Sequence, residues 1–236
     1  MQLYLTFEAK ETVCLPLNYN HAVQSALYRK LGEVDAGDQW HNGGFGEKNF
    51  KGYTFGRLRG EHYVKGKEIF FTRKISLEVR SSAFDFIDSL QRSLEREPFL
   101  LLGGQRVSLC DVRLSNKHIC GETAEFVTDS PVAVYKTQEE TGKTVFYSPE
   151  DEEFCTALKS NFEKKYLAVM GETPPKIEIR PIGTHKKVVT KYKSTWITAY
   201  DGKYRIFAQG KGLEFIYNSG LGSKNSQGFG MLNVLE

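Results

Sequence analysis

A tyrosine, a histidine and two lysines near the start of the sequence could together carry out acid–base chemistry. Tyr28 lies on the polar face of a predicted helix, and His41 follows in a glycine-rich segment, residues 32–52. Lys48 and Lys51 come soon after the histidine. An imidazole that titrates near neutral pH, a phenol and an ammonium can move protons and stabilise negative charge without a metal ion. The alternative is that the segment is an ordinary loop and His41 a solvated side chain without a catalytic role.

A glycine-rich segment from Ser219 to Gly230 is the strongest candidate for phosphate binding. It contains Gly220, Gly222, Lys224, Asn225, Gly228 and Gly230. Backbone N–H groups of such a loop, together with Lys224, can cradle a phosphodiester. The segment lacks the Gly-Lys-Ser/Thr triplet of a P-loop, and no helical pattern follows it, as a dinucleotide site would require. A hairpin loop without a ligand is the alternative.

A run of basic residues precedes this segment in the sequence. Residues 185–193 contain Lys186, Lys187, Lys191 and Lys193, with the aromatic residues Tyr192 and Trp196 among or beside them. Lysines interleaved with aromatic rings are typical of a ribbon that follows an RNA backbone and stacks on its bases. A solvated hairpin could have the same composition, and this alternative stays open.

The composition limits the class of protein. The 236 residues are 40% hydrophobic and 13% aromatic, which provides a core and excludes a disordered chain. No apolar run is long enough to span a bilayer and no signal peptide is indicated, so we expect a cytoplasmic protein without a membrane partner. The four cysteines form no C-x-x-C pair and the histidines no H-E-x-x-H motif, so we expect no metal site. The net charge is only +3, but basic residues outnumber acidic ones across residues 181–224, which predicts a basic face for a polyanion.

The hydrophobic pattern predicts the elements that position these residues. In the first half, strands are expected at residues 2–9, 53–58, 68–79 and 105–114, one helix after residue 18 or 20, and a second after Ser81 or Ser82. This β-α-β-β-α-β order is that of a ferredoxin-like unit. The second half is expected to be a degenerate copy, with a helix after Ser148 and strands at 124–127, 132–135, 176–182, 194–200, 204–209, 213–217 and 231–235. We therefore predict an α+β protein with two tandem ferredoxin-like (βαββαβ, RRM-like) domains, residues 1–117 and 118–236.

The end of the glycine-rich segment also resembles a known family. Residues 220–231, G-L-G-S-K-N-S-Q-G-F-G-M, resemble the glycine-rich signature of the CRISPR-associated endoribonucleases that process repeat transcripts into guide RNAs. These enzymes are the sixth Cas family, within the RAMP superfamily. Further similar stretches are residues 15–21 leading to Leu27 and Tyr28, residues 130–134, and residues 164–166. The resemblance therefore extends over nearly the whole chain.

The resemblance implies an activity and a set of catalytic residues. Members of the family cleave CRISPR repeat RNA (pre-crRNA) without a metal, by attack of a ribose 2′-OH on the adjacent phosphate, which leaves a 2′,3′-cyclic phosphate and a 5′-OH. One branch uses a tyrosine on the first helix, a histidine in the following loop and a lysine just beyond. In this sequence Tyr28, His41 and Lys51 match those positions, and Lys48 is the rival for the lysine. No cofactor is implied.

The resemblance also assigns the remaining polar residues to RNA binding. The glycine-rich segment and Lys186, Lys187, Lys191 and Lys193 would hold the repeat backbone. The expected partner is CRISPR repeat RNA, bound by a monomer or a homodimer that either acts alone or joins an effector complex. The main alternative is a non-catalytic RNA-binding subunit of such a complex, which would not need His41 and Tyr28. A phosphate-binding enzyme for small molecules is the third hypothesis, and the missing P-loop and dinucleotide motifs weigh against it.

Overall fold

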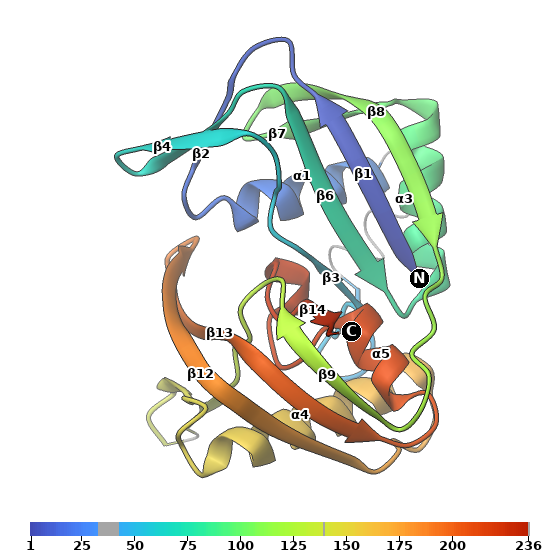
Figure 1. Ribbon diagram of the computed structural model, residues 1–236, viewed down its shortest axis with the longest axis vertical. Coiled ribbons are helices and arrows are strands. Elements are labelled where there is room, and N and C mark those ends of the chain that lie inside the picture. Colours follow the sequence, from blue (N-terminus) through green and yellow to red (C-terminus); the bar gives the residue numbers. More distant parts are fainter. Residues whose placement is uncertain (33–42, 139, 236) are drawn as a thin grey trace.

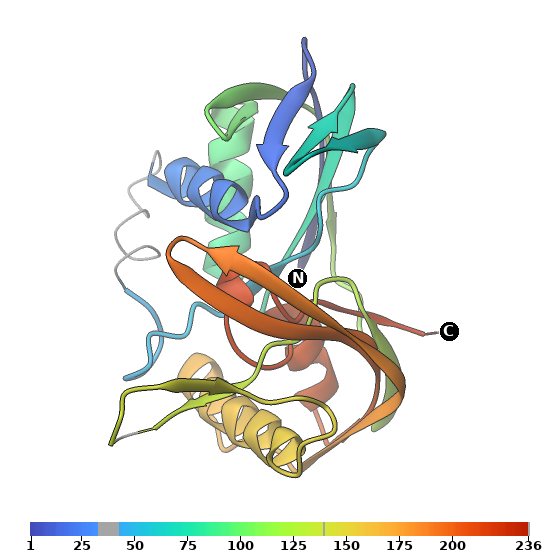
Figure 2. The same cartoon turned by 90° about the vertical axis from the view of Figure 1, so that its left-hand side faces the viewer.

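The first half of the chain forms one antiparallel sheet covered by two helices. The computed structural model describes residues 1–32, 43–138 and 140–235 (Figure 1). The sheet has the order β3-β6-β1-β8-β7, and α1 and α3 lie on one of its faces (Figure 2). These elements are β1 (Gln2–Glu8), α1 (Asn20–Gly32), β3 (Tyr53–Phe55), β6 (Lys74–Ser81), α3 (Phe84–Arg96), β7 (Phe99–Leu102) and β8 (Gln105–Ser115). The part β3-β6-β1-β8 of this sheet has the strand order of a ferredoxin-like unit, as predicted.

The apolar stripes of the two helices explain why they pack on this face. On α1, Val23, Ala26, Leu27 and Leu31 are buried, and these are the positions expected from the sequence. On α3, Phe86, Ile87, Leu90 and Leu94 are buried. Spacings of three and four residues place each set along one side of its helix. The polar side of α1, which carries Tyr28, is therefore free to face another part of the chain.

The predicted strand at residues 68–79 is wrong, because the chain divides there into two strands of different sheets. β5 (Glu68–Phe71) pairs with β2 (Val13–Pro16) and β4 (His62–Lys65), in a small sheet of order β2-β5-β4. β6 begins at Lys74 and pairs with β1 and β3. Buried residues stand at alternate positions on both sides of the polar residues 72–74 and in the same phase, so the period of two concealed the break; they are Ile69, Phe71, Ile75, Leu77 and Val79.

The second half repeats the same topology. Its sheet has the order β12-β13-β9-β14, which matches the order β3-β6-β1-β8 of the first half. The elements are β9 (Thr123–Thr128), α4 (Glu153–Met170), β12 (Ile177–Tyr192), β13 (Thr195–Ala208), α5 (Gly212–Ser219), the short 3₁₀ helix η1 (Asn225–Gln227) and β14 (Leu232–Val234). A separate ribbon of β10 (Tyr135–Thr137) and β11 (Thr144–Phe146) precedes α4. The prediction of two tandem ferredoxin-like units is confirmed.

The strand predicted at residues 213–217 is wrong, since these residues lie in α5. Seven of its eight residues are buried, so no polar face marks the helical period. A short apolar run cannot be assigned to strand or helix from periodicity alone. The topology decides the matter, because α5 supplies the second helix that this ferredoxin-like unit requires.

The basic segment forms the end of a long hairpin. β12 and β13 pair from Ile177 and Ala208 to Tyr192 and Thr195, with a bulge between Ile182 and Lys186. The predicted strands at 194–200 and 204–209 are one continuous strand. In Figure 1 the tip of this hairpin extends upward from the second half toward α1. The side chain of Asn18 confirms the contact, because its Nδ2 donates to the carbonyl of Lys191 at 2.8 Å.

A buried arginine joins the two halves. Arg80, near the end of β6, is 1% exposed and donates to the carbonyl of Leu232 and to Oδ1 of Asn233, each at 2.6 Å. Its guanidinium also lies over the ring of Tyr217, 3.9 Å from the centroid. The two halves otherwise have separate hydrophobic cores. The predicted division between residues 117 and 118 lies in the connection from β8 to β9, and it stays a prediction.

Candidate active site

A groove with a basic lining lies where the two halves meet. It has a volume of about 900 Å³ and is bordered by residues 48–53, by residues 134–137, by α4 and by the glycine-rich loop. We call it the basic groove. Its lysines are Lys48, Lys51, Lys136, Lys164, Lys165 and Lys224. Among the described lining residues the only carboxylate is that of Glu153, so the groove suits a polyanion.

Lys51 is positioned in the groove by the chain just before β3. Its side chain is half-buried and donates to the carbonyl of Gly43. Burial lowers the pKa of Lys51 below its ordinary value. Lys48 also lines the groove but is exposed. The structure thus places both candidates for the catalytic lysine at the same groove, and the choice of Lys51 stays a prediction.

Tyr28 faces the glycine-rich loop from α1. Its hydroxyl shares hydrogen bonds with the side chains of Tyr53 and Ser226, and its ring meets that of Tyr53 edge-on at 6.2 Å. Burial raises the pKa of Tyr28, so the phenol keeps its proton at neutral pH. Tyr53 and Ser226 both line the basic groove, which connects Tyr28 to it through one shared set of hydrogen bonds.

His41 lies outside the described residues, in the segment 33–42 between α1 and Gly43. Its predicted role as a general acid or base therefore stays a prediction. In the sequence it is followed two residues later by Gly43, whose carbonyl accepts the hydrogen bond from Lys51.

The glycines of the loop have a structural role that the sequence analysis did not predict, while the predicted phosphate cradle stays a prediction. Gly220, Gly222, Gly228 and Gly230 are buried, with φ angles between 71° and 83°. The N–H groups of Gly220, Gly228 and Gly230 donate to the carbonyls of Ile216, Asn225 and Pro131, at 2.8 to 2.9 Å. These donors already have acceptors within the protein. The glycines are required because such φ angles favour glycine and because their surroundings leave no space for a Cβ.

Asn225 and Lys224 were both predicted to bind RNA, but their side chains lie in different surroundings. Asn225 is buried, and its Nδ2 donates to the carbonyls of Leu221 and Phe229 at 3.1 and 3.0 Å, so it closes the loop on itself. Lys224 is half-buried at the groove, with its Nζ 5.0 Å from the centroid of the Tyr135 ring. Lys224 is therefore the member of this pair whose side chain can meet a phosphate.

The loop is held against α1 through its own carbonyl groups. The carbonyl of Ser226 accepts hydrogen bonds from Nε2 of Gln24 at 2.7 Å and from the hydroxyl of Tyr53 at 3.3 Å. The carbonyl of Gln227 accepts one from Nδ2 of Asn20 at 2.8 Å. The polar face of α1 thus fixes the position of η1. This is why Tyr28, from the first half, and Ser226, from the second, meet.

The lysines of the long hairpin lie on two different sides of it. Lys187 and Lys191 stand opposite Tyr200 and Trp196 in the register and share one face with them. Trp196 is 63% exposed, and the ammonium of Lys191 lies 6.0 Å from its ring centroid. The other face packs inward through Tyr192, Ile197 and Ala199. Lys187, Lys191 and Trp196 therefore form an exposed basic and aromatic stripe.

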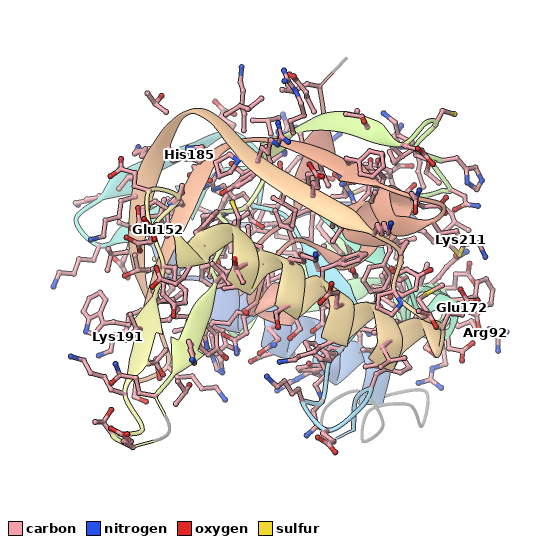
Figure 3. All side chains as sticks on the ribbon, turned by 90° about the horizontal axis from the view of Figure 1, so that it is seen from below. Arg92, Glu152, Glu172, His185, Lys191 and Lys211 are labelled. Carbon is pink, nitrogen blue, oxygen red and sulfur yellow. The ribbon has the colours of Figure 1, made fainter. Side chains whose placement is uncertain are left out.

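The other two hairpin lysines lie off this stripe. Lys186 stands opposite Asp201, and Lys193 occupies the turn with a φ of 52°. Figure 3 shows Lys191 on the same side of the molecule as Glu152, the residue before α4. Glu172, beyond the other end of α4, lies on the opposite side. None of the four hairpin lysines belongs to the described lining of the basic groove. The protein thus has two separate positive surfaces.

The sequence analysis missed several residues of the groove. Tyr53, Lys136, Lys164, Lys165 and Ser226 all line it. Lys164 and Lys165 lie in the stretch 164–166 that resembles the family, and Lys165 also continues the apolar stripe of Leu158 and Phe162 at helical spacing. A lysine at such a position must find hydrogen-bond partners in the interior.

The described part of the chain contains no cluster of His, Cys, Asp and Glu that could hold a metal ion. None of its helices is long and apolar enough to cross a bilayer.

Comparison with known proteins decides the family. Residues 114–234 match the family model described as CRISPR associated protein Cas6, C-terminal. The chain belongs to the Cas6 family. The resemblance seen in the glycine-rich segment is therefore confirmed.

Two curated Cas6 relatives align with nearly the whole chain. An endoribonuclease-like protein, Cas6nc, from Pyrococcus horikoshii is 28% identical, with 96% of each chain covered. A CRISPR-associated endoribonuclease Cas6 from Pyrococcus furiosus is 26% identical and covers 93% of this chain and 83% of its own. Among solved structures, one described as a RAMP protein binding different RNA substrates has a TM-score of 0.85 at 24% identity, over 100% of both chains. At that identity the likeness shows the fold.

The loop geometry predicts that Gly230→Ala destabilises this Cas6 protein more than Gly210→Ala. Both glycines have positive φ angles, 75° and 55°, so both substitutions carry a backbone cost of about 1–2 kcal/mol. A Cβ at residue 230 would also lie 2.0 Å from the carbonyl oxygen of Leu221, whereas a Cβ at residue 210 meets nothing within 4 Å. Overpacking adds about 1–3 kcal/mol at residue 230. Urea unfolding of the two variants measures the difference, and equal losses would contradict the steric role of Gly230.

Proposed function

We propose that this protein cleaves CRISPR repeat RNA in precursor transcripts to produce guide RNAs, by a metal-independent reaction. The observation that carries the proposal is the basic groove, which brings Lys51, Lys224 and the hydrogen-bonded pair of Tyr28 and Ser226 to one place. A related protein from Pyrococcus furiosus is named a CRISPR-associated endoribonuclease, which supports the same activity. A groove of this charge suits a phosphodiester backbone.

The proposed reaction needs three groups around one phosphate. The 2′-oxygen attacks phosphorus, the bond from phosphorus to the 5′-oxygen breaks, and the products are a 2′,3′-cyclic phosphate and a 5′-OH. A base takes the proton of the 2′-OH, an acid gives a proton to the 5′-oxygen, and a cation stabilises the negative charge of the transition state. His41, Tyr28 and Lys51 have the side-chain chemistry for these roles.

The environment of Tyr28 favours one division of the roles. Burial raises its pKa, which makes the phenol a weaker acid, but the phenol stays protonated at neutral pH and can donate to the 5′-oxygen as negative charge develops there. We therefore assign the donor role to Tyr28 and the base role to His41. Lys51, at the groove beside β3, is assigned to the transition-state charge.

RNA binding is assigned to the two positive surfaces. Lys224 would contact the backbone in the groove, and the stripe of Lys187, Lys191 and Trp196 would hold a further part of the strand by charge and stacking. Lys186 and Lys193 would add charge beside the stripe. Gly220, Gly222, Gly228, Gly230 and Asn225 would act indirectly, by giving the loop its shape.

The experiment that tests the proposal is a cleavage assay in excess EDTA with a CRISPR-repeat RNA from the same genome. A matched RNA carries a single 2′-deoxy substitution at the cut site. We expect cleavage of the first RNA, with a 2′,3′-cyclic phosphate on the upstream product, and no cleavage of the second. Tight binding without cleavage of either would instead identify an RNA-binding subunit of an effector complex. Cleavage of the 2′-deoxy RNA would contradict attack by the 2′-OH.

We expect His41→Ala to slow cleavage by about 10²–10⁴-fold, because one general acid or base contributes that much. Its affinity for the 2′-deoxy RNA should stay close to that of the wild type, since the imidazole is assigned to proton transfer. His62→Ala is the control, because His62 is exposed on β4. Single-turnover rates and binding titrations give the two quantities. An unchanged rate constant for His41→Ala would remove this residue from the mechanism.

We expect Lys187→Ala and Lys191→Ala to weaken RNA binding while the cleavage rate at saturation changes little. Each removes a positive charge from the exposed stripe, so the slope of log affinity against log salt should fall by about 0.7 for a single strand. Lys203→Ala, on the exposed part of β13 away from the stripe, is the control. Binding titrations at several salt concentrations measure the slope. An intact affinity with a greatly reduced rate would contradict this assignment.

A further inference from the structure

Lys165 is a buried ammonium whose three hydrogen-bond acceptors are uncharged oxygens. Lys165 is 3% exposed and lies in the C-terminal half of α4. Nζ donates to the carbonyl of Gly220 at 2.6 Å, to that of Gly222 at 3.2 Å and to Oδ1 of Asn225 at 2.8 Å. A charge buried in this way is costly for the protein. Such a cost calls for an explanation in terms of function.

All three acceptors of Lys165 belong to the glycine-rich loop. They are spread over six residues, from Gly220 to Asn225, so one side chain holds the beginning of the loop and the start of η1 together. Asn225 in turn holds two further parts of the loop, because its Nδ2 donates to the carbonyl of Leu221 and, across the loop, to that of Phe229. The shape of the loop therefore depends directly on Lys165.

The far side of the same loop carries the residue that touches Tyr28. Ser226 directly follows Asn225 in η1, and its side chain shares a hydrogen bond with the Tyr28 hydroxyl. Its carbonyl is fixed by Gln24 and Tyr53. Ser226 thus lies between an anchor on α4 and an anchor on α1. A displacement of the loop on the α4 side would move Ser226 relative to Tyr28.

We propose that Lys165 is a positioning residue, whose ammonium group holds the glycine-rich loop in the form that presents Ser226 to Tyr28. It acts through the loop and does not touch the reacting atoms. This role rests on the proposed cleavage activity, but the tethering of the loop itself can be tested without RNA.

The protonation of Lys165 supplies a test in the wild-type protein. Burial lowers its pKa to about 7, so the ammonium predominates below that pH and the neutral amine above it. The amine donates weaker hydrogen bonds than the ammonium. Other titratable groups share the groove with it, and they are Lys164 and Glu153 of α4, Lys224 of the loop, Lys48, Lys51 and Tyr53, and Tyr135, Lys136 and Tyr147 beside β10 and β11.

The first experiment measures amide hydrogen exchange of the loop in the full-length protein at pH 6 and pH 8.5. Rates are corrected for the intrinsic effect of pH. We expect the N–H groups of Leu221, Ser223 and Gly230, which donate within the protein, to lose protection several-fold at the higher pH. The amides of β1 are the internal control and should not change. Equal protection of the loop at both pH values would overturn the dependence on the ammonium.

The second experiment compares Lys165→Met with Lys159→Met on the same helix. Lys159 is exposed and lies outside the groove lining, so its substitution should leave cleavage unchanged. For Lys165→Met we expect a single-turnover rate about 100-fold lower, the size of effect that a displacement of about 1 Å in an active site produces. Its affinity for the 2′-deoxy RNA should change far less. Lys165→Arg, which keeps the charge, should recover part of the rate.

The outcomes separate the positioning role from the alternatives. A Lys165→Met protein with the wild-type rate, or with equal losses of rate and affinity, would overturn the proposal. If Lys165→Met does not fold, the exchange experiment on the wild-type protein decides. If the wild-type protein cleaves no repeat RNA but its loop loses protection at pH 8.5, the proposed function fails while the tethering by Lys165 stands.

Discussion

The arrangement depends on polar groups buried between two ferredoxin-like units. Arg80 crosses from the first sheet to a carbonyl and a side-chain amide of β14. Asn20, Gln24 and Tyr53 donate to the carbonyls of the glycine-rich loop. A buried donor or acceptor without a partner costs more than an apolar contact of the same size, so these pairs admit one docking of the two units. The basic groove exists only in that docking, since its walls come from both halves. The contacts that stabilise the docking of the two units therefore also determine the shape of the basic groove.

The sequence was sufficient for the architecture where the hydrophobic period was clear. The stripe Val23, Ala26, Leu27 and Leu31 predicted α1, and the β-α-β-β-α-β order predicted the first unit. It was insufficient where burial removed the period. α5 is buried on nearly all sides, so its residues show no helical period and the sequence predicts a strand there. β5 and β6 are predicted as one strand because buried residues such as Phe71 and Ile75 continue the same period of two across residues 72–74. Such errors come from tertiary contacts that no local pattern encodes.

The site was predictable by residue type and less so by role. Lys51 and Lys224, far apart in the sequence, do line one groove, and Tyr28 does face the glycine-rich loop. The high glycine content marked the loop in the sequence. Its predicted phosphate-binding N–H groups are partly used within the protein, because those of three glycines donate to carbonyls of the chain. The position of Lys165 on the apolar stripe of α4 indicated that it is buried, but only the three-dimensional structure shows that its hydrogen-bond acceptors lie in the loop.

The repetition of one topology in both halves has a consequence for how a loop of new shape can arise. In the first unit, the connection from the second helix to the last strand is β7 with the turn at Gly103 and Gly104, which extends the sheet. In the second unit, the same connection is the glycine-rich loop. A doubled fold has two equivalent connections, of which only one faces the partner unit. One copy can keep closing its own sheet while the other acquires a new shape, so a new site is gained without loss of the scaffold.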